Sequence, residues 1–360
     1  MNLKSTQYME SFEAHWGVPG GIFQTIVGAQ LKGMELPCPP RIRHELHLDE
    51  QSRAILYEIE AKDQSKPIIM LAHGMGGCSE SGYMKRISTK LWMQGYGVFL
   101  INHRGSGPGM GLSPRLWNGG ASDDLAKMID FVIQRNPDKF LVPIGFSLSG
   151  NILLKYLGES QIIPSKVLGV LAVNPPIDLR IASAIISRKW SCAVFNQYYM
   201  KLIRNQAVAL VKQFPSAFSP LKNFKTIWDF DVSYTAPSGG YKDVDDYYDQ
   251  CSSRYYLKRI EIPTSILCAE DDPFVPGKIF DQVEMSERVT LHKPKKGGHM
   301  GYIARNVTPH GDRRWMDYAI LEWIRELSTG GKSSNPKQKP PLGVGKFSPR
   351  VVVQNTGDKP

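Results

Sequence analysis

Long hydrophobic runs are absent from the sequence. No segment approaches the roughly 18 to 20 consecutive apolar residues that a membrane-spanning helix requires, so no integral membrane segment is expected. The first ten residues, MNLKSTQYME, also lack the basic-then-apolar pattern of a secretory signal. These two absences together predict a cytoplasmic protein.

Cysteine is scarce, and no two cysteines have C-x-x-C spacing. An odd and dispersed set of five argues against a disulfide framework and against a zinc site, so ordinary reduced thiols are expected. Neither H-E-x-x-H nor another ligand cluster is present. We therefore expect no metal. The five cysteines are Cys38, Cys78, Cys192, Cys251 and Cys268.

Two glycine-rich stretches lack the spacing of nucleotide-binding motifs. In the stretch 105–111, the sixth position of G-x-G-x-x-G is Met110 when counted from Gly105 and Leu112 when counted from Gly107. A P-loop ending at Gly331 would need its first glycine where Glu326 stands. No nucleotide cofactor, and no other cofactor, is therefore expected.

The excess of positive charge is concentrated at one end of the chain. The formal net charge is +10 over 360 residues, and residues 329–360 hold six basic residues against one acid, Asp358. That segment is rich in Pro, Gly, Ser and Lys, a composition typical of a disordered, solvated tail. The remaining charge is ordinary for the length of the chain, so no nucleic-acid partner is expected.

Strand-like and helix-like segments alternate over residues 67–157. Short apolar runs at 67–71, 95–103 and 140–146 predict buried strands, and the segments between them predict helices. This alternation predicts a mostly parallel sheet with helices on both faces. Further strands are expected at 44–59, 168–174, 262–269 and 289–292, and further helices at 22–33 and 314–327.

The region 177–256 interrupts that rhythm with helical stretches that carry many aromatic residues. We interpret it as a helical cap that walls a pocket, although most of its aromatic side chains are expected to form its own core. The expected organisation is as follows: an N-terminal extension and first strand, 1–60; a first core part, 61–176; the cap, 177–256; a second core part, 257–328; and the disordered basic tail, 329–360.

The most informative stretch is Gly145-Phe146-Ser147-Leu148-Ser149-Gly150, which follows an apolar run and precedes a helix-compatible segment. This layout is typical of a nucleophile elbow, a sharp strand-to-helix turn that lifts a serine hydroxyl above the end of a sheet. The Leu148 N–H would lie at a helix N-terminus, where developing negative charge is stabilised. Two features depart from the usual form: Ser149 replaces a glycine, and Pro143 lies within the expected strand.

A second glycine-rich turn, His73-Gly74-Met75-Gly76-Gly77, follows the buried strand at 67–71. Such a turn exposes backbone N–H groups, and we assign a second oxyanion donor to Met75. A plain strand-to-helix connection is the alternative. At 122–124, Ser-Asp-Asp opens a helix, and we interpret Ser122 as its capping residue.

Acids and a histidine follow the two late strands. Glu270, Asp271 and Asp272 come directly after the strand at 262–269, and His299 lies between Gly298 and Met300 on a loop after the last strand. A histidine beside glycines can approach a serine and act as its base. His73 and His103 are expected to be structural, and His292 and His310 have no glycine loop to present them.

Several of these motifs together resemble the YheT-like α/β-hydrolases, relatives of the ABHD esterases and lipases. The resemblance covers about residues 20–327, and the family pattern has glycine at position 149. It implies an α/β-hydrolase fold and selects Asp272, which directly precedes Pro273, as the acid of the set Ser147, Asp272 and His299. The matching motifs are HGMGG at 73–77, NHRG at 102–105, GFSLSGN at 145–151, DDPF at 271–274 and GGH at 297–299.

The chain is accordingly expected to be a serine hydrolase that cleaves carboxylic esters of short or medium chain length, or acylglycerols, through an acyl-enzyme. Its substrate would be a small ester or lipid, and the sequence leaves its oligomeric state open. One alternative is a thioesterase or alcohol acyltransferase with the same three residues. Another is a non-catalytic lipid-binding protein on a hydrolase scaffold, which a misformed elbow at Ser149 would favour.

Overall fold

The computed structural model describes residues 11–31, 34–159, 162–219 and 224–328. The predicted disordered tail, 329–360, and the first ten residues, on which the expectation about a secretory signal rested, lie outside these ranges. Within them, no helix combines the length and hydrophobicity needed to cross a bilayer.

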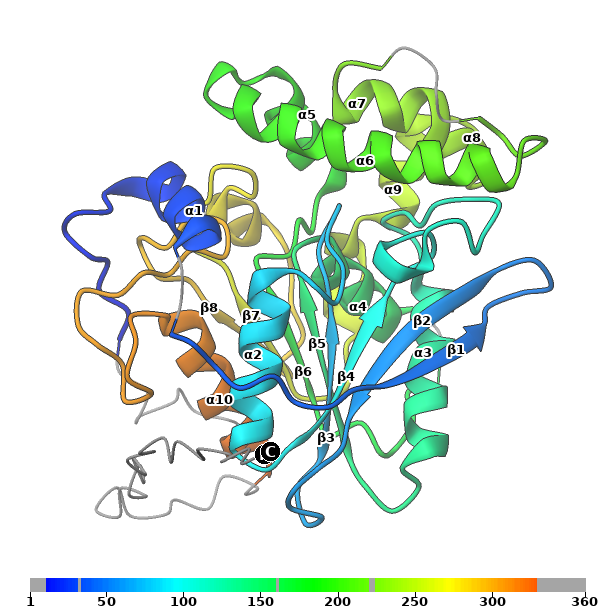
Figure 1. Cartoon of the computed structure of the whole chain (residues 1–360). Helices are drawn as coiled ribbons and strands as arrows, with labels where there is room; N and C mark the ends of the chain where they lie inside the picture. The colour runs from blue at the N-terminus through cyan, green and yellow to red at the C-terminus, as the bar shows by residue number, and fades with distance from the viewer. Residues whose placement is uncertain (1–10, 32–33, 160–161, 220–223, 329–360) are drawn as a thin grey trace, which may run out of the picture.

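One eight-stranded sheet forms the centre of the molecule (Figure 1), with the strand order β1-β2-β4-β3-β5-β6-β7-β8. β2 pairs antiparallel with β1 and with β4, and the other neighbouring strands pair in parallel. The sheet is therefore mostly parallel, as the alternating pattern predicted. The strands are β1 (Ile42–His47), β2 (Arg53–Ile59), β3 (Ile68–Ala72), β4 (Gly97–Asn102), β5 (Leu141–Phe146), β6 (Val170–Val173), β7 (Thr264–Leu267) and β8 (Val289–His292).

The prediction of a single strand over 44–59 was wrong. This segment forms most of a hairpin in which Ile42 of β1 pairs with Glu58 of β2, and the chain reverses where the Leu48 N–H donates to the Ser52 carbonyl oxygen. The polar residues between the two strands favour a turn. Strand-like residues stand on both sides of that turn, so the pattern alone did not show the reversal.

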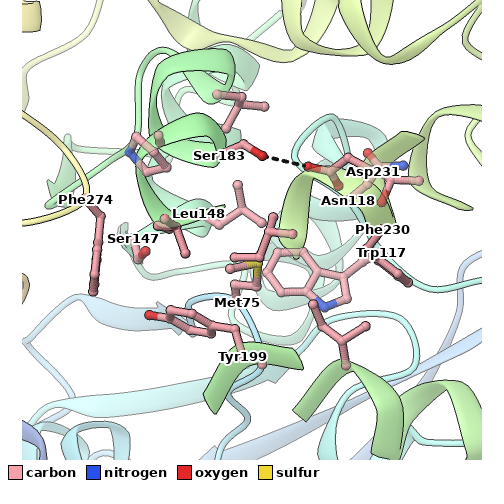
Figure 2. Close-up of a pocket in the computed structure, with 18 of the residues that line it drawn as sticks. Met75, Trp117, Asn118, Ser147, Leu148, Ser183, Tyr199, Phe230, Asp231 and Phe274 are labelled. Atoms are coloured by element: carbon pink, nitrogen blue, oxygen red, sulfur yellow. Dashed lines mark hydrogen bonds between the residues drawn. The ribbon is translucent and has the colours of Figure 1, made fainter. Parts of the chain in front are cut away.

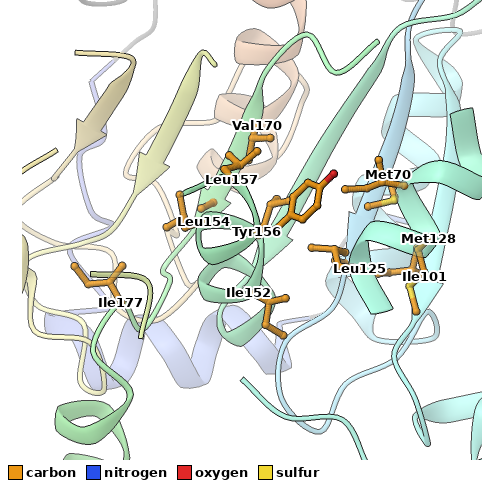
Figure 3. Close-up of a cluster of buried hydrophobic side chains, with 14 of the residues drawn as sticks. Met70, Ile101, Leu125, Met128, Ile152, Leu154, Tyr156, Leu157, Val170 and Ile177 are labelled. Atoms are coloured by element: carbon orange, nitrogen blue, oxygen red, sulfur yellow. The ribbon is translucent and has the colours of Figure 1, made fainter. Parts of the chain in front are cut away.

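Helices cover both faces of the sheet, because the side chains of each buried strand alternate between the two faces. Ile69 and Leu71 of β3 pack on the face covered by α2 (Gly82–Met93) and α10 (Trp315–Ser328). Ile68 and Met70 pack on the other face, which α3 (Ser122–Arg135) and α4 (Leu148–Gly158) cover. Figure 3 shows part of this second core, with side chains of α3 and α4 gathered around Met70.

Pro143 lies inside β5 without a bulge, opposite Met70 of β3. The N–H groups of Leu141, which begins β5, and of Ser147, which follows it, point toward the β6 side. The Pro143 nitrogen points the same way, because neighbouring residues alternate in direction. Regular pairing with β6 begins only at Ile144. The missing N–H of Pro143 therefore falls where the ladder has not yet begun.

A helical cap insertion lies between β6 and β7, above the carboxyl ends of the parallel strands (Figure 1). The residue boundaries of the cap, 177–256, remain a prediction. Its elements are α5 (Leu179–Arg188), a 3-10 turn η2 (Trp190–Cys192), α6 (Ala193–Gln213), α7 (Ile227–Phe230), a π-helix η3 (Asp231–Thr235), α8 (Ala236–Ser238) and α9 (Val244–Cys251). Further 3-10 turns are η1 (Gly107–Gly109), η4 (Ser253–Tyr255), η5 (Leu257–Arg259) and η6 (Gly277–Gln282).

The helix predicted over 22–33 is α1 (Gly20–Gln30), which begins two residues earlier; residues 32–33 lie outside the described ranges. Its glycines allow a very close approach to the segments that follow β7 and β8. A Cβ at Gly28 would lie 2.5 Å from the Gly301 Cα, and a Cβ at Gly21 would lie 1.7 Å from the Asp271 carbonyl oxygen. α1 thus braces the loop that carries His299.

Candidate active site

Ser147 occupies the predicted strand-to-helix turn between β5 and α4. Its backbone has φ 52° and ψ −121°, a conformation with positive φ that is costly for a residue with a Cβ. The Ser147 N–H donates to the Val173 carbonyl oxygen at 2.8 Å, which ties the turn to β6. A Cβ at Gly145 would lie only 2.6 Å from the Ser149 carbonyl oxygen, so glycine is required there. The elbow is therefore formed, and it presents the Ser147 side chain above the edge of the sheet.

His299 lies between Ser147 and Asp272 and is hydrogen-bonded to both. The His299 Nε2 is 2.9 Å from the Ser147 Oγ, and the His299 Nδ1 is 2.7 Å from the Asp272 Oδ2. We refer to these three side chains as the Ser147–His299–Asp272 array. Asp272 and His299 are both buried, with relative exposures of 5% and 8%. The structure thus brings together three residues that lie on three separate segments of the sequence.

Asp272 is held from all sides by hydrogen-bond donors. Its Oδ1 accepts the N–H groups of Phe274 at 2.8 Å and Val275 at 3.0 Å, and its Oδ2 accepts the Asn174 Nδ2 at 2.7 Å as well as His299. Because every donor fixes one oxygen in place, Asp272 has one orientation toward the imidazole. With the carboxylate on Nδ1, the Nε2 of a neutral His299 is free to accept the Ser147 proton.

The rival acid Asp271 has a different place. Its Oδ1 accepts the Gly298 N–H at 2.9 Å, whereas the hydrogen bonds of the His299 ring go to Asp272 and Ser147. Burial raises the pKa of the Asp271 carboxyl. Asp271 therefore anchors the loop that carries His299, while Asp272 faces the imidazole itself.

Met75 and Leu148, the two predicted oxyanion donors, line the same pocket as Ser147 and His299. Leu148 is the first residue of α4, where the helix dipole is positive. Within the described part of the chain, neither its N–H nor that of Met75 donates a backbone or side-chain hydrogen bond. Both groups are therefore available beside Ser147, and their oxyanion role remains a prediction.

Ser149 fits the elbow by directing its hydroxyl into the protein. The Ser149 Oγ donates to the His73 carbonyl oxygen and lies 2.6 Å from the His103 Nε2. His103 stacks on Trp117 with ring centroids 4.1 Å apart. Burial lowers the pKa of His73 to about 4 and that of His103 well below its usual range, so both rings are neutral. Ser149 thus links the elbow to the turn that contains Met75.

The prediction of Ser122 as a helix cap was wrong. Ser122 is already the first residue of α3, Ala121 precedes it, and no side chain caps this end of the helix. The acids of the first turn have another use: Asp124 accepts two hydrogen bonds from the buried guanidinium of Arg104. The ion pair with Arg104 fixes the position of the Asp124 carboxylate, and no sequence pattern linked these two residues.

The pocket over Ser147 is walled mainly by apolar side chains of the cap and of the loops above the sheet (Figure 2). The aromatic residues of 177–256 that line this pocket are Tyr199, Phe230, Tyr247 and Tyr248. Three others, Trp190, Tyr198 and Phe218, are exposed. The apolar contribution comes mostly from aliphatic residues: Leu116, Leu148, Leu179, Ala182, Ile186, Ile203, Ile227 and Val275.

Residues 67–305 match the family described as "alpha/beta hydrolase fold". The chain belongs to this family. Solved structures of α/β-hydrolases share its fold: 2,6-dihydroxy-pseudo-oxynicotine hydrolase aligns with a TM-score of 0.56 at 16% identity, covering 84% of this chain and 72% of that one. The α/β hydrolase GrgF from Penicillium sp. sh18 aligns with a TM-score of 0.53 at 16% identity, covering 81% and 99%.

Among curated relatives of this α/β-hydrolase, monoacylglycerol lipase ABHD2 of Danio rerio is 27% identical over 344 residues, covering 91% of this chain and 78% of the relative. Monoacylglycerol lipase of Saccharomyces cerevisiae is 29% identical over 274 residues, covering 73% of this chain and 60% of the relative. YheT of Escherichia coli is 27% identical over 273 residues, covering 74% and 79%. The resemblance to YheT and to the ABHD proteins is thereby confirmed.

Sequence reasoning missed several residues that support the site of this α/β-hydrolase. Asn174, at φ 48°, donates to Asp272 and to the Gly298 carbonyl oxygen, and the Thr25 Oγ1 accepts the His299 N–H at 2.8 Å. Asn174 directly follows β6 at the edge of the sheet that carries Ser147, and this position could have marked it as a residue of the site. Thr25 belongs to the stretch 23–26, which resembles the N-terminal stretch of the family, but it lies 274 residues from His299 and no local pattern linked the two. Among the described residues, no group of three His, Cys, Asp or Glu side chains is arranged to hold a metal ion.

Proposed function

We propose that the protein is a serine hydrolase that cleaves carboxylic esters, acylglycerols among them, through an acyl-enzyme. The observation that carries this proposal is the position of His299, within hydrogen-bonding distance of both Ser147 and Asp272. The relatives named monoacylglycerol lipase support the substrate class. The apolar pocket above Ser147 suits an acyl chain of short or medium length.

In the first half-reaction, the Ser147 Oγ attacks the acyl carbon while the His299 Nε2 takes its proton. Asp272 keeps the Nδ1–H of His299 in place and stabilises the imidazolium that forms. The N–H groups of Met75 and Leu148 donate to the oxyanion. His299 then returns its proton to the departing alcohol as the carbon–oxygen bond breaks, which leaves Ser147 acylated.

In the second half-reaction, His299 takes a proton from water, and the resulting hydroxide attacks the acyl carbon. The proton passes to Ser147 as the acid leaves. A non-catalytic lipid-binding role has no support in the elbow, because Ser149 causes no distortion that separates Ser147 from His299. Water is the acceptor in this proposal, and an alcohol in its place would give acyl transfer.

A fluorophosphonate probe tests the proposal, because it reacts only with a serine whose proton a base can remove. The parent protein is expected to label at Ser147, and Ser147→Ala is expected to remain unlabelled. A matched control is Ser233→Ala, which changes a serine of the cap that does not line the pocket. A folded parent protein that does not label, or a label that maps to Ser149, would contradict the proposed function.

A further inference from the structure

One carboxylate interrupts the apolar wall of the pocket. Among the described residues that line it, Asp231 is the only acid, and no lysine or arginine is present. Asp231 is buried, with a relative exposure of 8%. Figure 2 shows it beside Ser183, on a part of the wall separate from Ser147. The mechanism proposed above gives this carboxylate no task.

Three cap elements converge on Asp231. It is the first residue of the π-helix η3, and its neighbours Ser183 and Tyr248 come from α5 and α9. Ser183, Tyr248 and Thr235 also line the pocket. π-helical turns are rare and frequently occur at functional sites. Asp231, Ser183, Tyr248 and Thr235 therefore form a polar cluster at the pocket surface. Its members come from separate segments and not from one exposed helix face.

The hydrogen bonds of this group leave the carboxylate with unused capacity. The Tyr248 hydroxyl lies 2.9 Å from the Asp231 Oδ2 and 2.8 Å from the Ser183 Oγ, so its single proton has two competing acceptors. The Ser183 Oγ lies 3.5 Å from the same Asp231 oxygen. An ionised carboxylate accepts about four hydrogen bonds. Ser183, Tyr248 and Thr235 offer three hydroxyl protons at most, which do not fill that number.

A purely structural role would not require an acid here. The Tyr248 hydroxyl donates to Ser183, so this bond alone connects α9 with α5, and the remaining Ser183 proton needs one acceptor, which a neutral amide would also supply. Burying a carboxylate without a cation is costly, and burial raises the pKa of Asp231 to about 6. A group that costs stability and faces a ligand pocket is most simply explained by contact with the ligand.

The chemistry of this site limits what it recognises. An acceptor in an apolar pocket attracts a neutral hydrogen-bond donor and repels the carboxylate of a free acid. We propose that Asp231, with Ser183 and Tyr248, forms a hydroxyl-recognition site that selects esters carrying a free O–H group in addition to the ester bond. This inference rests on the proposed esterase function. The hydroxyl belongs either to the alcohol part, as in a monoacylglycerol, or to the acyl part, as in a hydroxy acid.

Two pairs of matched substrates distinguish these sources. The first pair is 1-octanoylglycerol and propyl octanoate, which differ only in the hydroxyls of the alcohol. The second is methyl 8-hydroxyoctanoate and methyl octanoate, which differ only in a hydroxyl of the acid. The parent protein is expected to prefer the hydroxylated member of one pair by about tenfold or more in kcat/KM, the effect of a hydrogen bond to a charged group. The pair that shows this preference identifies the source.

Asp231→Asn and Tyr248→Phe are expected to lose that preference. The matched control is Asp249→Asn, which changes an exposed acid on α9, paired with Arg180 at 3.0 Å and outside the pocket; it should keep the preference. Equal kcat/KM within both pairs for the parent protein, or an unchanged preference in folded Asp231→Asn, would overturn the inference.

A binding measurement separates this inference from the proposed function. Ser147→Ala is titrated calorimetrically with the uncleavable ethers 1-O-octylglycerol and octyl propyl ether, and with the alcohols 1,8-octanediol and 1-octanol. Tighter binding of the hydroxylated member of a pair than of its partner supports the hydroxyl-recognition site, provided that the Ser147→Ala, Asp231→Asn double variant loses this difference. That result would support the site even if fluorophosphonate labelling of the parent fails. Two results together would refute the hydroxyl-recognition site and leave the esterase proposal intact. They are labelling of the parent protein and equal binding of both members of each pair by Ser147→Ala.

Discussion

The two walls of the pocket are built differently. On the sheet side, Asp272 accepts hydrogen bonds from two backbone N–H groups, the Asn174 side chain and His299, and these segments follow strands of one sheet. On the cap side, aliphatic and aromatic side chains predominate, and Asp231 is the one acid among the described lining residues. Hydrogen bonds are directional, whereas apolar contacts tolerate small shifts. The sheet side is therefore suited to chemistry and the cap side to selecting substrates.

Substitutions on the two walls should have different effects on activity. A change on the sheet side should lower turnover of every ester by a similar factor, because it alters the reacting groups. A change on the cap side should alter the ranking of substrates, because it alters only the contacts to the parts that do not react. The following variants test that difference.

The largest effect is expected for Asp272→Asn, which should lower kcat by about 10⁴-fold for every ester, because the amide no longer holds His299 in the required tautomer. The matched control is Asp271→Asn, which changes the neighbouring acid and leaves the His299 contact intact. Its kcat should fall by less than about tenfold, since one hydrogen bond to a loop N–H is weakened. Initial rates on two esters measure both. Equal losses in the two variants would contradict the assignment of Asp272.

Ser149→Ala is the next test of the sheet side. It removes the hydroxyl that connects the His73 carbonyl oxygen with the His103 ring, so the turn containing Met75 loses an anchor. We expect kcat to fall by about tenfold with KM unchanged, and the free energy of unfolding to fall by about 1–3 kcal/mol because buried groups lose a partner. Steady-state kinetics and urea unfolding measure the two effects. An unchanged kcat would show that Ser149 does not position the oxyanion donor.

On the cap side, Ala182→Leu should narrow the pocket. Ala182 is a buried residue of α5 that lines it. We expect kcat/KM to fall by about tenfold for an octanoate ester, because the larger side chain overpacks the space for the acyl chain at a cost of about 1–3 kcal/mol. For an acetate ester, kcat/KM should change little. Ala184→Leu, on the same helix and outside the pocket lining, is the control. A uniform loss across ester lengths would mean that the cap does not select substrates by size.

The smallest effect concerns the pH dependence of stability. The pKa of Asp231 is about 6 in the folded protein, above its usual value of 3.8. The folded state therefore holds this proton more tightly than the unfolded state, and the acid destabilises the fold progressively as pH rises from about 4 to above 6. Asp231→Asn should consequently be more stable than the parent at pH 8, by about 1–3 kcal/mol, with no gain at pH 4. Thermal unfolding at both pH values measures this. A gain at pH 4 of the same size would contradict the raised pKa.

The sequence alone was sufficient for the local parts of this molecule. Alternating apolar segments predicted buried strands between helices, and small residues around Ser147 predicted the elbow, because side-chain periodicity and turn geometry are properties of short segments. The same reasoning failed at 44–59, where similar residues continue through a hairpin, and at Ser122, which is already inside α3 and whose hydroxyl bonds to the Gly120 carbonyl oxygen and to Lys155.

The sequence by itself determined which residue types meet at the carboxyl edge of the sheet, because the ends of parallel strands necessarily lie together. Only the tertiary structure decided how they are supported. Thr25 of α1 accepts the His299 N–H, and Asn174 donates to Asp272. Ser149 is hydrogen-bonded to His73 and His103. The same is true of Asp231, whose partners come from two other helices. These contacts join segments distant in the chain, and their geometry depends on the packing of the whole fold.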